Sequence, residues 1–439
     1  MTKKELCLEN AGSLNLKNKK VTVIGAAKSG AAVAKLVVRQ GGIAKISEQQ
    51  PRSCANEAMQ MLLSTESILT EWGGHTRNFI EDSDCVVLSP GVRSNAQSVE
   101  WARNKNIPVL GEVEFAWNFC PAPVIAVTGS NGKTTTVTLI AEILKKAGRR
   151  VCLCGNIGTP LSSFVLDLTA EDWVVLEISS FQLEATSRFR PDVAVLLNIS
   201  QNHLDRHKDL DEYCAAKAKI FANQRADDFA ILNREIPNLR ELAGMLRAQV
   251  SFFNEPDKMR SSSNPNHLAA LEVARVLGIQ EKIAQDVFSS FQGVEHRLER
   301  VRTLEGVEYI NDSKATTAEA GRWALERVDK PVIMICGGRD KNIDFNVLRP
   351  LMKNKVKELI TIGEARDKLF QTFHDVVRVT ACSSMEEAVH AARQCAHSGD
   401  CVVLSPMCAS FDMFTDFEER GRVFKNICIQ HIYPHSHQI

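Results

Sequence analysis

TGSNGKTTT, residues 128–136, is the stretch that decides the fold. An apolar run at residues 123–127 precedes it, and the apolar side chains of residues 137–144 have the spacing of a helix that lies on a sheet. This pattern predicts a strand, a tight loop and a helix. Gly129 and Gly132 allow the loop to turn its N–H groups inward, where they can bind phosphate oxygens at the helix N-terminus.

The side chains of this loop favour a nucleotide triphosphate as the ligand. Lys133 supplies a positive charge for the β- and γ-phosphates, and the Thr134 hydroxyl can bind magnesium. Only Ser130 and Asn131 separate the two glycines, whereas the general P-loop has four residues there. The sequence therefore predicts a shortened P-loop, and the alternative is an ordinary glycine turn with a surface lysine.

The composition is that of a soluble globular protein with about three domains. Of the 439 residues, 44% are hydrophobic and 24% are charged. Lysine plus arginine equals aspartate plus glutamate, 53 each, so no global field attracts nucleic acid or an anionic membrane. No secretory signal and no membrane-spanning apolar stretch is evident. We expect a cytoplasmic monomer whose thirteen scattered cysteines are reduced, without nucleic-acid or membrane partners.

An amino-terminal unit resembling a dinucleotide-binding fold is predicted next. A buried strand at residues 21–24 leads into the turn Gly25–Gly30, and a helix follows through Arg39. The middle glycine of GxGxxG is absent, which weakens an NAD-dependent redox function, although one diphosphate could still bind at the helix N-terminus. The second strand ends in Glu48, about twenty residues further on, where such folds contact a nucleotide. The segment Ser89-Pro90-Gly91 ends another strand and is either a ligand site or a proline turn.

The rest of the chain predicts two further α/β domains. A proline-rich segment at residues 120–123 indicates a boundary, so we expect domains at residues 1–116, 117–297 and 298–439. In the second domain, one apolar strand ends in Glu177, and another precedes His203, which on its own is an ordinary histidine. Four strands, parallel and with helices between them, are expected in the third domain at residues 307–311, 331–336, 359–363 and 400–404. The polar segment 254–266 is expected to be a loop, followed by a helix at 268–277.

Several motifs together resemble the Mur ligases, ATP-dependent enzymes that form amide bonds in peptidoglycan synthesis. Four of them are TGSNGKTT at 128–135, LEISSFQLE at 176–184, NISQNHLDRH at 198–207 and NDSKATT at 311–317. Others are the Gly25–Gly30 turn with SPG, GEVE at 111–114, GNIG at 155–158, GGRDKN at 337–342 and LSPMCASFDMFTDFEERG at 404–421. The second group is most similar to the members that add D-glutamate, and the match spans nearly the whole chain.

The resemblance implies a fold and a reaction. The fold has a Rossmann-like UDP-binding domain, a central P-loop ATPase-type parallel sheet and a Rossmann-like C-terminal α/β domain. The reaction joins UDP-N-acetylmuramoyl-L-alanine to D-glutamate with hydrolysis of ATP. A carboxylate is a poor electrophile, so the γ-phosphoryl group is first moved to it, which gives an acyl phosphate that the amine attacks. Two anions approach each other, and cations must offset their repulsion.

The resemblance also implies a metal site with two magnesium ions. Thr134 and Glu177 would bind the first, and His203 with a carbamylated Lys217 would bind the second. A lysine cannot bind a cation while it is an ammonium ion, so its pKa near 10.4 must fall before it reacts with carbon dioxide. Without the resemblance, Lys217 would be taken for an exposed helix lysine.

The remaining site residues follow from the same resemblance. The expected catalytic residues are Lys133, His203, Lys217 and Lys314. The expected ATP contacts are Gly129, Asn131, Gly132, Lys133, Thr134, Thr135, Arg297 and Asp312. The expected UDP-sugar contacts are Lys28, Ser29, Glu48, Ser89, Pro90, Gly91, Asn156, Ser179 and Gln182. The expected D-glutamate pocket comprises Thr316, Lys341, Ser410, Phe411 and Phe417, although Ser410 to Phe417 alone would suggest a turn and a helix start.

The chain departs from the family at three places, and other functions share some of its motifs. Ser262-Ser263 stands where a His-Asn pair usually contacts adenine, Asn202 where an acidic residue is frequent, and Glu48 where an aspartate is expected. A P-loop phosphotransferase or nucleotide switch would share the loop but leave NDSKATT unexplained, and a dehydrogenase is supported only by Gly25–Gly30. Within the ligase class, the L-alanine-adding Mur ligase and folylpolyglutamate synthetase are the nearest alternatives.

Overall fold

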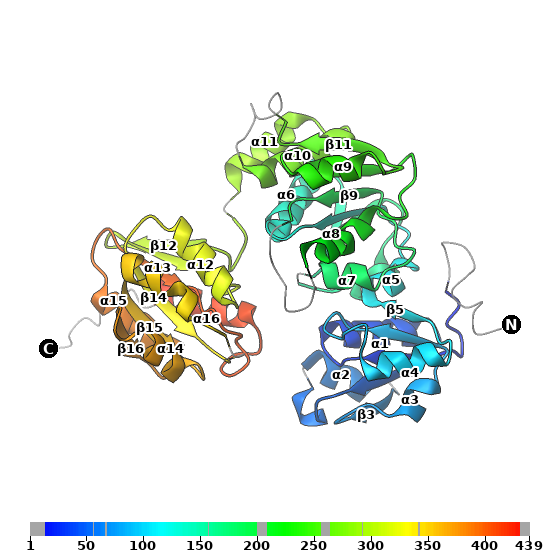
Figure 1. Ribbon diagram of the computed structural model, residues 1–439, viewed down its shortest axis with the longest axis horizontal. Helices are drawn as coiled ribbons and strands as arrows, with labels where there is room; N and C mark the ends of the chain where they lie inside the picture. Colours follow the sequence, from blue (N-terminus) through cyan, green and yellow to red (C-terminus); the bar gives the residue numbers. More distant parts are fainter. Residues whose placement is uncertain are drawn as a thin grey trace. The chain divides into compact units, whose positions relative to one another are not determined.

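The computed structural model describes residues 14–55, 57–65, 68–156, 158–199, 209–255, 264–291, 293–340 and 343–430. The chain divides into two compact units, Met1–Phe291 and Gln292–Ile439 (Figure 1). The first unit contains two parallel sheets and the second contains one mixed sheet. Among the described residues, no helix is long and apolar enough to cross a membrane.

The amino-terminal sheet is fully parallel, with strand order β3-β2-β1-β4-β5. Its strands are β1 (Lys20–Ile24), β2 (Ile43–Glu48), β3 (Leu69–Trp72), β4 (Cys85–Leu88) and β5 (Val109–Gly111). Its helices are α1 (Lys28–Arg39), α2 (Glu57–Thr65), α3 (Arg77–Glu81), α4 (Gln97–Asn104) and α5 (Glu112–Trp117), with a short 3-10 turn, η2, at Arg52–Cys54. A Cβ at Gly30 would lie 2.0 Å from the Gly25 carbonyl oxygen, so the predicted glycine turn is confirmed as a close backbone approach.

The second sheet is also parallel, with strand order β11-β10-β9-β6-β8-β7. Its strands are β6 (Val124–Thr128), β7 (Arg150–Gly155), β8 (Asp172–Glu177), β9 (Val193–Leu196), β10 (Phe229–Asn233) and β11 (Gln249–Phe253). Its helices are α6 (Lys133–Lys146), α7 (Ser180–Glu184), α8 (Leu210–Ala218), α9 (Pro237–Ala243), α10 (Pro265–Val276) and α11 (Glu281–Ser290). Short 3-10 turns are η3 (Leu161–Ser163), η4 (Val165–Asp167) and η5 (Lys219–Phe221).

Helix α10 begins earlier than the sequence suggested. The loop was expected to extend to residue 266, but the helix starts at Pro265 with Asn264 as its N-cap. The Asn264 side chain accepts a hydrogen bond from the Asn266 N–H, and proline needs no partner at the first helical position, so both residues favour a helix start. Helices α6, α10 and α11 share one apolar cluster with the strands beneath them.

Two buried glutamates of the GEVE motif join the two sheets of the first unit. The Glu114 carboxylate accepts hydrogen bonds from three consecutive backbone N–H groups, those of Ser187, Arg188 and Phe189, and from the Ser187 hydroxyl. Glu112 accepts from the N–H and the hydroxyl of Ser162. Buried carboxylates are costly unless their oxygens are bonded, and both oxygens of Glu114 are, whereas Glu112 is bonded through Oε1 alone. These contacts fix the end of the amino-terminal domain on the second sheet.

Gly111 lies at the same junction. Its N–H donates to the Ala185 carbonyl oxygen over 3.1 Å, and a Cβ at this position would lie 2.8 Å from the Ala185 Cβ. The backbone angles of Gly111, φ −76° and ψ 161°, suit any residue. The glycine is therefore required by the contact with Ala185 and not by the conformation of the chain.

The second unit contains a six-stranded sheet of order β12-β13-β17-β14-β15-β16. Its strands are β12 (Glu299–Leu304), β13 (Val307–Asn311), β14 (Val332–Gly337), β15 (Val356–Ile362), β16 (Arg378–Ala381) and β17 (Cys401–Leu404). Its helices are α12 (Ala318–Arg327), α13 (Arg349–Lys355), α14 (Arg366–Phe373), α15 (Met385–Cys395) and α16 (Phe417–Gln430), with the turn η7 at Asn346–Leu348.

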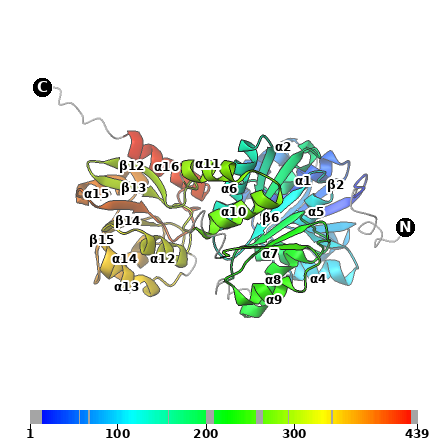
Figure 2. The ribbon, with the colours of Figure 1, turned by 90° about the horizontal axis from the view of Figure 1, so that it is seen from above.

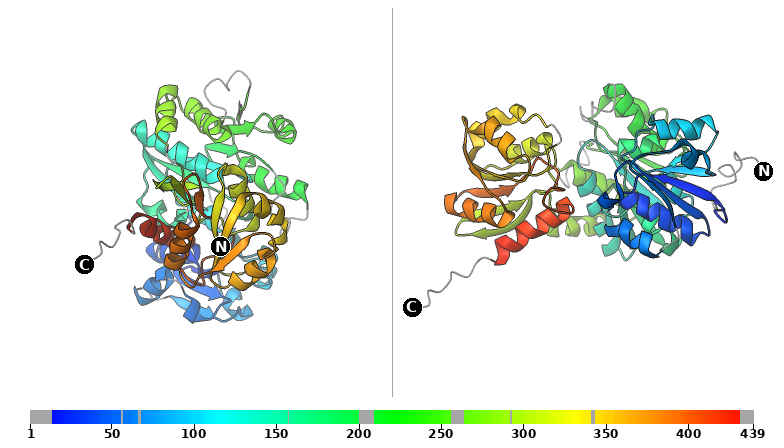
Figure 3. Two further views of the ribbon diagram at one scale, coloured as in Figure 1. Left: turned by 90° about the vertical axis from the view of Figure 1, so that its left-hand side faces the viewer. Right: turned by 90° about the horizontal axis from the view of Figure 1, so that it is seen from below.

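The four central strands are parallel, as predicted, and β12 pairs antiparallel to β13. Edge strands β12 and β16 were not predicted, because their partly exposed segments lack the continuous apolar run of a central strand. Helices α15 and α16 cover one face of the sheet and α12, α13 and α14 the other (Figure 2). Figure 3 shows α16, in red, against this sheet.

Candidate active site

The predicted P-loop connects β6 to α6. Gly129 has φ 155° and Gly132 has φ 82°, which are backbone angles that side chains disfavour, and Gly132 is the N-cap of α6. The Lys133 ammonium group donates to the carbonyl oxygens of Gly129 and Ser130 over 2.9 and 3.1 Å. The lysine thus lies over the loop where phosphate oxygens are expected to bind.

Asn198, which follows β9, fixes the tip of this loop. Its carbonyl oxygen accepts from the Ser130 N–H over 3.0 Å. Its side-chain amide makes two bonds to Asn131, accepting from the N–H over 2.9 Å and donating to the carbonyl oxygen over 3.1 Å. The loop conformation is therefore held by the neighbouring strand end as well as by its glycines.

The two residues expected to bind the first magnesium ion lie side by side. The Thr134 hydroxyl donates to one Glu177 carboxylate oxygen over 2.8 Å, and the Asn156 side-chain amide donates to the other over 2.8 Å. Thr134 and Glu177 are buried at 4% and 2% exposure. Hydroxyl and carboxylate oxygens are the ligands that magnesium prefers, so this pair fits the ion.

Gly155 presses the turn before Asn156 onto the end of β8. A Cβ at Gly155 would lie 2.2 Å from the Glu177 carbonyl oxygen, and the same oxygen accepts from the Asn156 N–H over 2.8 Å. Asn156, expected among the UDP-sugar contacts, therefore lies directly beside the candidate metal ligands.

Lys217 is buried, with 1% exposure, at the last turn of α8. Its ammonium nitrogen donates to the Gly129 carbonyl oxygen over 3.0 Å and lies 4.5 Å from the centre of the Tyr213 ring. Burial lowers the pKa of Lys217 to about 7, and the positive charge of Lys133 acts in the same direction while Glu177 opposes it. The interpretation of this residue as an exposed lysine, drawn without the resemblance, is wrong. The apolar residues of α8 do not form a regular stripe, so no pattern marks its buried face.

A pocket in the first unit brings together three of the residues expected to bind the UDP-sugar. Ser89 and Pro90 line it from the end of β4, and Gln182 lines it from α7. Its other lining residues are Leu88, Val92, Ser94, Gly111, Glu112, Phe181, Glu184 and Ala185. Gln182 forms a capping box with Ser179, which explains the fixed start of this short helix.

Two of the expected UDP-sugar contacts, Glu48 and Ser89, form hydrogen bonds to the glycine turn that follows β1. Glu48 accepts from the Ala26 N–H over 2.6 Å, and the Ser89 hydroxyl donates to the Gly25 carbonyl oxygen over 3.0 Å. Lys28 and Gly91 are exposed, and Ser29 is partly exposed. The turn is thus braced from β2 and β4, and the first turn of α1 carries Lys28 and Ser29.

In the second unit, the segment NDSKATT follows β13. Asp312 is buried and accepts from the Ser405 hydroxyl over 2.9 Å and from the Leu298 N–H over 3.2 Å. Burial raises the pKa of the Asp312 carboxyl to about 7, against the opposing effect of these bonds and of the Arg297 charge. The Arg297 guanidinium lies 5.4 Å from the centre of the Trp323 ring.

The expected catalytic Lys314 and the described residues of the expected D-glutamate pocket follow two neighbouring strands, β13 and β17. Lys314, after β13, has its ammonium nitrogen 5.7 Å from the centre of the Phe417 ring at the start of α16. Ser410, after β17, is buried, whereas Phe411 is 58% exposed and Thr316 is partly exposed. His203 and Lys341, together with Asn202 and Ser262-Ser263, lie outside the described residues.

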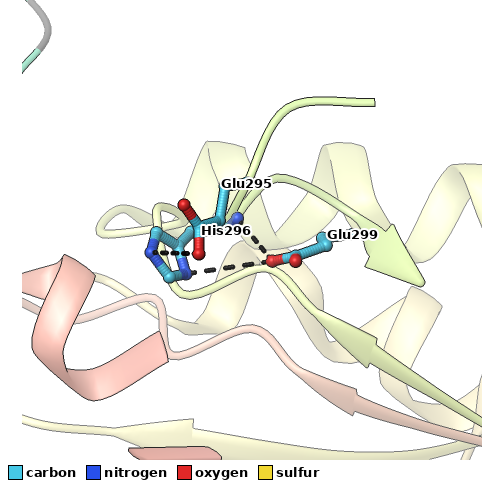
Figure 4. Close-up of side chains that lie close together, drawn as sticks. All are labelled: Glu295, His296 and Glu299. Carbon is cyan, nitrogen blue, oxygen red and sulfur yellow. Dashed lines mark hydrogen bonds and ion pairs between the residues drawn. The ribbon is translucent and has the colours of Figure 1, made fainter. Parts of the chain in front are cut away.

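A cluster of Glu295, His296 and Glu299 has the composition of a metal site (Figure 4). The Lys425 ammonium nitrogen already lies 2.9 Å from a Glu295 oxygen and 2.5 Å from a Glu299 oxygen. The Asn311 amide contacts both Glu299 Oε2 and His296 Nδ1. Burial lowers the pKa of His296, so it is neutral near pH 7. The Lys425 ammonium group occupies the position beside the two carboxylates where a metal ion would bind. The cluster is therefore a hydrogen-bonded junction between α16 and the start of β12.

Sequence reasoning missed Asn198, Tyr213 and Arg420, although each belongs to a quoted or neighbouring motif. Tyr213 packs beside Lys217, and the Ser130 hydroxyl contacts its phenol oxygen over 3.3 Å. Of the three, only Arg420 could have been recognised as buried from the sequence, because the apolar Phe424 and Cys428 follow it at i+4 and i+8, on the same side of a helix.

Comparisons with known proteins give matches over nearly the whole chain. Three family models match: the Mur ligase MurD-like N-terminal domain at residues 19–111, the Mur ligase middle domain at 127–293, and the Mur ligase glutamate ligase domain at 296–408. A relative from Koribacter versatilis is 39% identical and covers 94% of this chain and 98% of its own. Another from Pelodictyon phaeoclathratiforme is 40% identical and covers 95% and 99%. Both are named UDP-N-acetylmuramoylalanine--D-glutamate ligase.

Solved structures show the same fold at low identity. The UDP-N-acetylmuramate-alanine ligase MurC from Thermotoga maritima is 16% identical, with a TM-score of 0.57, and covers 93% of this chain and 98% of its own. The MurF ligase from Thermotoga maritima, in complex with ADP, is 17% identical, with a TM-score of 0.56 and coverages of 95% and 96%. With three family models and near-full-length relatives in agreement, this chain belongs to the Mur ligase family.

Proposed function

We propose that this Mur ligase joins D-glutamate to UDP-N-acetylmuramoyl-L-alanine, with hydrolysis of ATP to ADP and phosphate, through an acyl-phosphate intermediate. The observation that carries the proposal is the group of Lys133, Thr134, Glu177 and the buried Lys217 around one P-loop carbonyl and one carboxylate. The names of the near-full-length relatives support the choice of substrates.

The P-loop and Lys133 bind the triphosphate. To do so, the Lys133 ammonium group exchanges its bonds with the Gly129 and Ser130 carbonyl oxygens for bonds with phosphate oxygens. The γ-phosphoryl group passes to a carboxylate oxygen of the UDP-sugar substrate, and ADP leaves. The amine of D-glutamate then attacks the carbonyl carbon and loses a proton, and phosphate leaves with the former carboxylate oxygen. Each transfer needs the two reacting groups in contact and in line, which is what the surrounding residues provide.

Two magnesium ions would complete the site. Thr134 and Glu177 fit the first, and a carbamylated Lys217 with His203 would hold the second. When bound, the ions would offset the charge of the triphosphate and the substrate carboxylate. The residues of the chain prepare this arrangement: Asn156 orients the Glu177 carboxylate, and burial keeps a large part of Lys217 neutral, which is the form that reacts with carbon dioxide.

The substrates are assigned to the described residues by the same proposal. Ser89, Pro90 and Gln182, which share one pocket, would contact the UDP-sugar. The remaining UDP-sugar contacts would be Lys28, Ser29, Glu48, Gly91, Asn156 and Ser179. Thr316, Ser410, Phe411 and Phe417, with Lys341, would bind D-glutamate, while Lys314, Asp312 and Arg297 would lie near the phosphates. We also propose the domain boundaries 1–116, 117–297 and 298–439 and a monomer that acts in the cytoplasm.

One incubation tests the proposal. The protein is supplied with UDP-N-acetylmuramoyl-L-alanine, ATP, magnesium and a panel of amino acids, and the product is weighed by mass spectrometry. We expect a product that contains D-glutamate, and release of phosphate only when both co-substrates are present. Lys133→Met should abolish it, whereas Lys145→Met, which changes an exposed lysine of the same helix, should not. A product with another amino acid, or ATP hydrolysis independent of both co-substrates, would contradict the proposal.

A further inference from the structure

Arg420 is the largest fully buried side chain of the described residues, with 1% exposure. It lies on α16, on the same side of the helix as the buried Phe424 and Cys428. A buried guanidinium group is costly unless its charge is paired and its N–H groups are bonded. A fully buried arginine therefore requires an explanation beyond packing.

All three hydrogen bonds of the guanidinium group go to uncharged oxygen atoms. Nε donates to the Ser313 hydroxyl over 3.0 Å, Nη2 to the Ser313 carbonyl oxygen over 2.8 Å, and Nη1 to the Cys408 carbonyl oxygen over 3.1 Å. No ion pair of Arg420 with a carboxylate occurs among the described residues. Burial lowers the pKa of Arg420 to about 10, so it stays protonated near pH 7. The Asp412 carboxylate opposes this effect through its negative charge but makes no hydrogen bond to the guanidinium group, so the buried positive charge is only partly offset.

The two bonded segments are the loops that carry most of the candidate amino-acid site. Ser313 lies between Asp312 and Lys314 after β13, and Cys408 lies two residues before Ser410 after β17. These loops are also joined by one backbone hydrogen bond, in which the Met407 N–H donates to the Ala315 carbonyl oxygen over 2.7 Å.

A third segment is joined through the same serine. The Ser313 hydroxyl accepts from Arg420 and donates to the Phe417 carbonyl oxygen over 2.8 Å. Phe417 begins α16, one turn before Arg420, and its ring faces Lys314. The guanidinium group therefore links the β13 loop, the β17 loop and the first turn of α16 at one point, with the rigid fork that only arginine has.

We propose that Arg420 is a positioning residue for the anionic amino-acid substrate: it holds the three segments of the pocket together, and its positive charge, which Asp412 offsets only in part, also attracts the substrate carboxylates. The proposal rests on the D-glutamate site proposed above. An amino acid with two carboxylates brings further negative charge towards the guanidinium group, and a buried charge attracts it more strongly than an exposed one.

Kinetics of Arg420→Met and Arg420→Lys test this role. Methionine removes both the charge and the fork, whereas lysine keeps the charge but cannot make the three bonds. We expect the KM for D-glutamate to rise roughly tenfold or more in Arg420→Met and by a smaller factor in Arg420→Lys, because bonds to charged groups contribute this much. The KM values for ATP and for the UDP-sugar should stay within about twofold.

Two further variants separate the possible outcomes. Arg302→Met changes another arginine of this unit that donates to a backbone carbonyl, that of Cys428, and should leave the KM for D-glutamate unchanged. Ser410→Ala tests the site itself. If Ser410→Ala raises the KM for D-glutamate and Arg420→Lys does not, the positioning role is wrong while the site stands. If neither changes it, the proposed site is wrong as well. A loss in kcat alone, or an equal rise in the KM values for D-glutamate, ATP and the UDP-sugar, would also overturn the positioning role. If Arg420→Met does not fold, the kinetics of Arg420→Lys decide the question.

Discussion

Replacing Lys217 by methionine should stabilise the protein at neutral pH while it removes activity. Methionine keeps the approximate length of the side chain and removes its charge. The pKa of Lys217 falls from 10.5 to about 7 in the folded protein, chiefly through burial. At about 1.4 kcal/mol for each pH unit, this difference corresponds to roughly 5 kcal/mol of free energy against the ammonium form.

The sign of the pH dependence follows from the two protonation states. Between about pH 7 and pH 10.5 the unfolded chain binds a proton at Lys217 that the folded chain does not, so stability of the wild type rises with pH in this range. Below about pH 7 the folded protein carries the full cost of the buried charge. Lys217→Met lacks this cost. Its advantage should be largest near pH 6 and should shrink towards pH 10.

The assay is denaturant unfolding of both proteins in buffers free of carbon dioxide, at pH 6 and pH 9. Lys219→Met is the matched control, because Lys219 is exposed and lies two residues further along the chain. We expect it to show no pH-dependent difference. A gap between Lys217→Met and the wild type that is the same at pH 6 and pH 9 would refute the argument that burial lowers the pKa of Lys217.

Activity gives a second readout of the same residue. At pH 7.5, a pKa of about 7 leaves about three quarters of Lys217 neutral, compared with roughly 0.1% for an ordinary lysine. Carbon dioxide reacts with the neutral amine, so the wild type should respond to added bicarbonate. Lys217→Ala should lose about 100-fold or more in kcat and regain part of it with short carboxylates such as formate. Unchanged activity of Lys217→Ala, with no effect of formate, would exclude a role for a carbamate.

Three further predictions follow from other buried groups. Asp312→Asn should gain stability over the wild type as pH rises from about 4 to about 7, by up to roughly 4 kcal/mol. The pKa of the wild-type carboxyl is raised to about 7 in the folded protein, so over this range unfolding releases a proton and the wild type loses stability, whereas asparagine does not titrate. Denaturant unfolding of both proteins at pH 4.5 and pH 8 checks this. Glu114→Gln should destabilise the first unit by roughly 2 kcal/mol in thermal or denaturant unfolding. The glutamine NH₂ group would replace a carboxylate oxygen and would point at backbone N–H groups, which need an acceptor. Tyr213→Ala should raise the pKa of Lys217 by admitting water and move the pH profile of activity to higher pH, whereas Tyr213→Phe should keep it.

Local patterns predicted the elements that have strong local causes. The strand at residues 21–24, the helix through Arg39 and the P-loop with its helix all follow from apolar spacing and glycine placement, and the structure contains each of them. The pairing of Thr134 with Glu177 was expected from the family resemblance, and the structure places the two side chains in contact at the carboxyl ends of neighbouring parallel strands.

Burial of polar side chains was much harder to predict. The sequence around Lys217 has ordinary helical composition, and the only local sign at Arg420 is its spacing from Phe424 and Cys428, so the burial of both cations depends on contacts with neighbouring elements. The GEVE glutamates were recognised as part of a motif, but their partners lie about 50 and 75 positions away in the chain. Edge strands β12 and β16 were not predicted because their sequences contain no apolar run, and they are strands only through pairing with the neighbouring strand.

The contact between Gly111 and Ala185 has a consequence for how this sequence can vary. Because Gly111 has backbone angles open to any residue, an alanine there is opposed chiefly by the methyl group of Ala185, 2.8 Å from the added Cβ, and less by the Ala185 carbonyl oxygen, at 3.2 Å. A glycine at position 185 would make room for it. In related sequences, an alanine at position 111 should therefore occur together with a glycine at position 185. The double variant Gly111→Ala with Ala185→Gly should recover stability that Gly111→Ala alone loses.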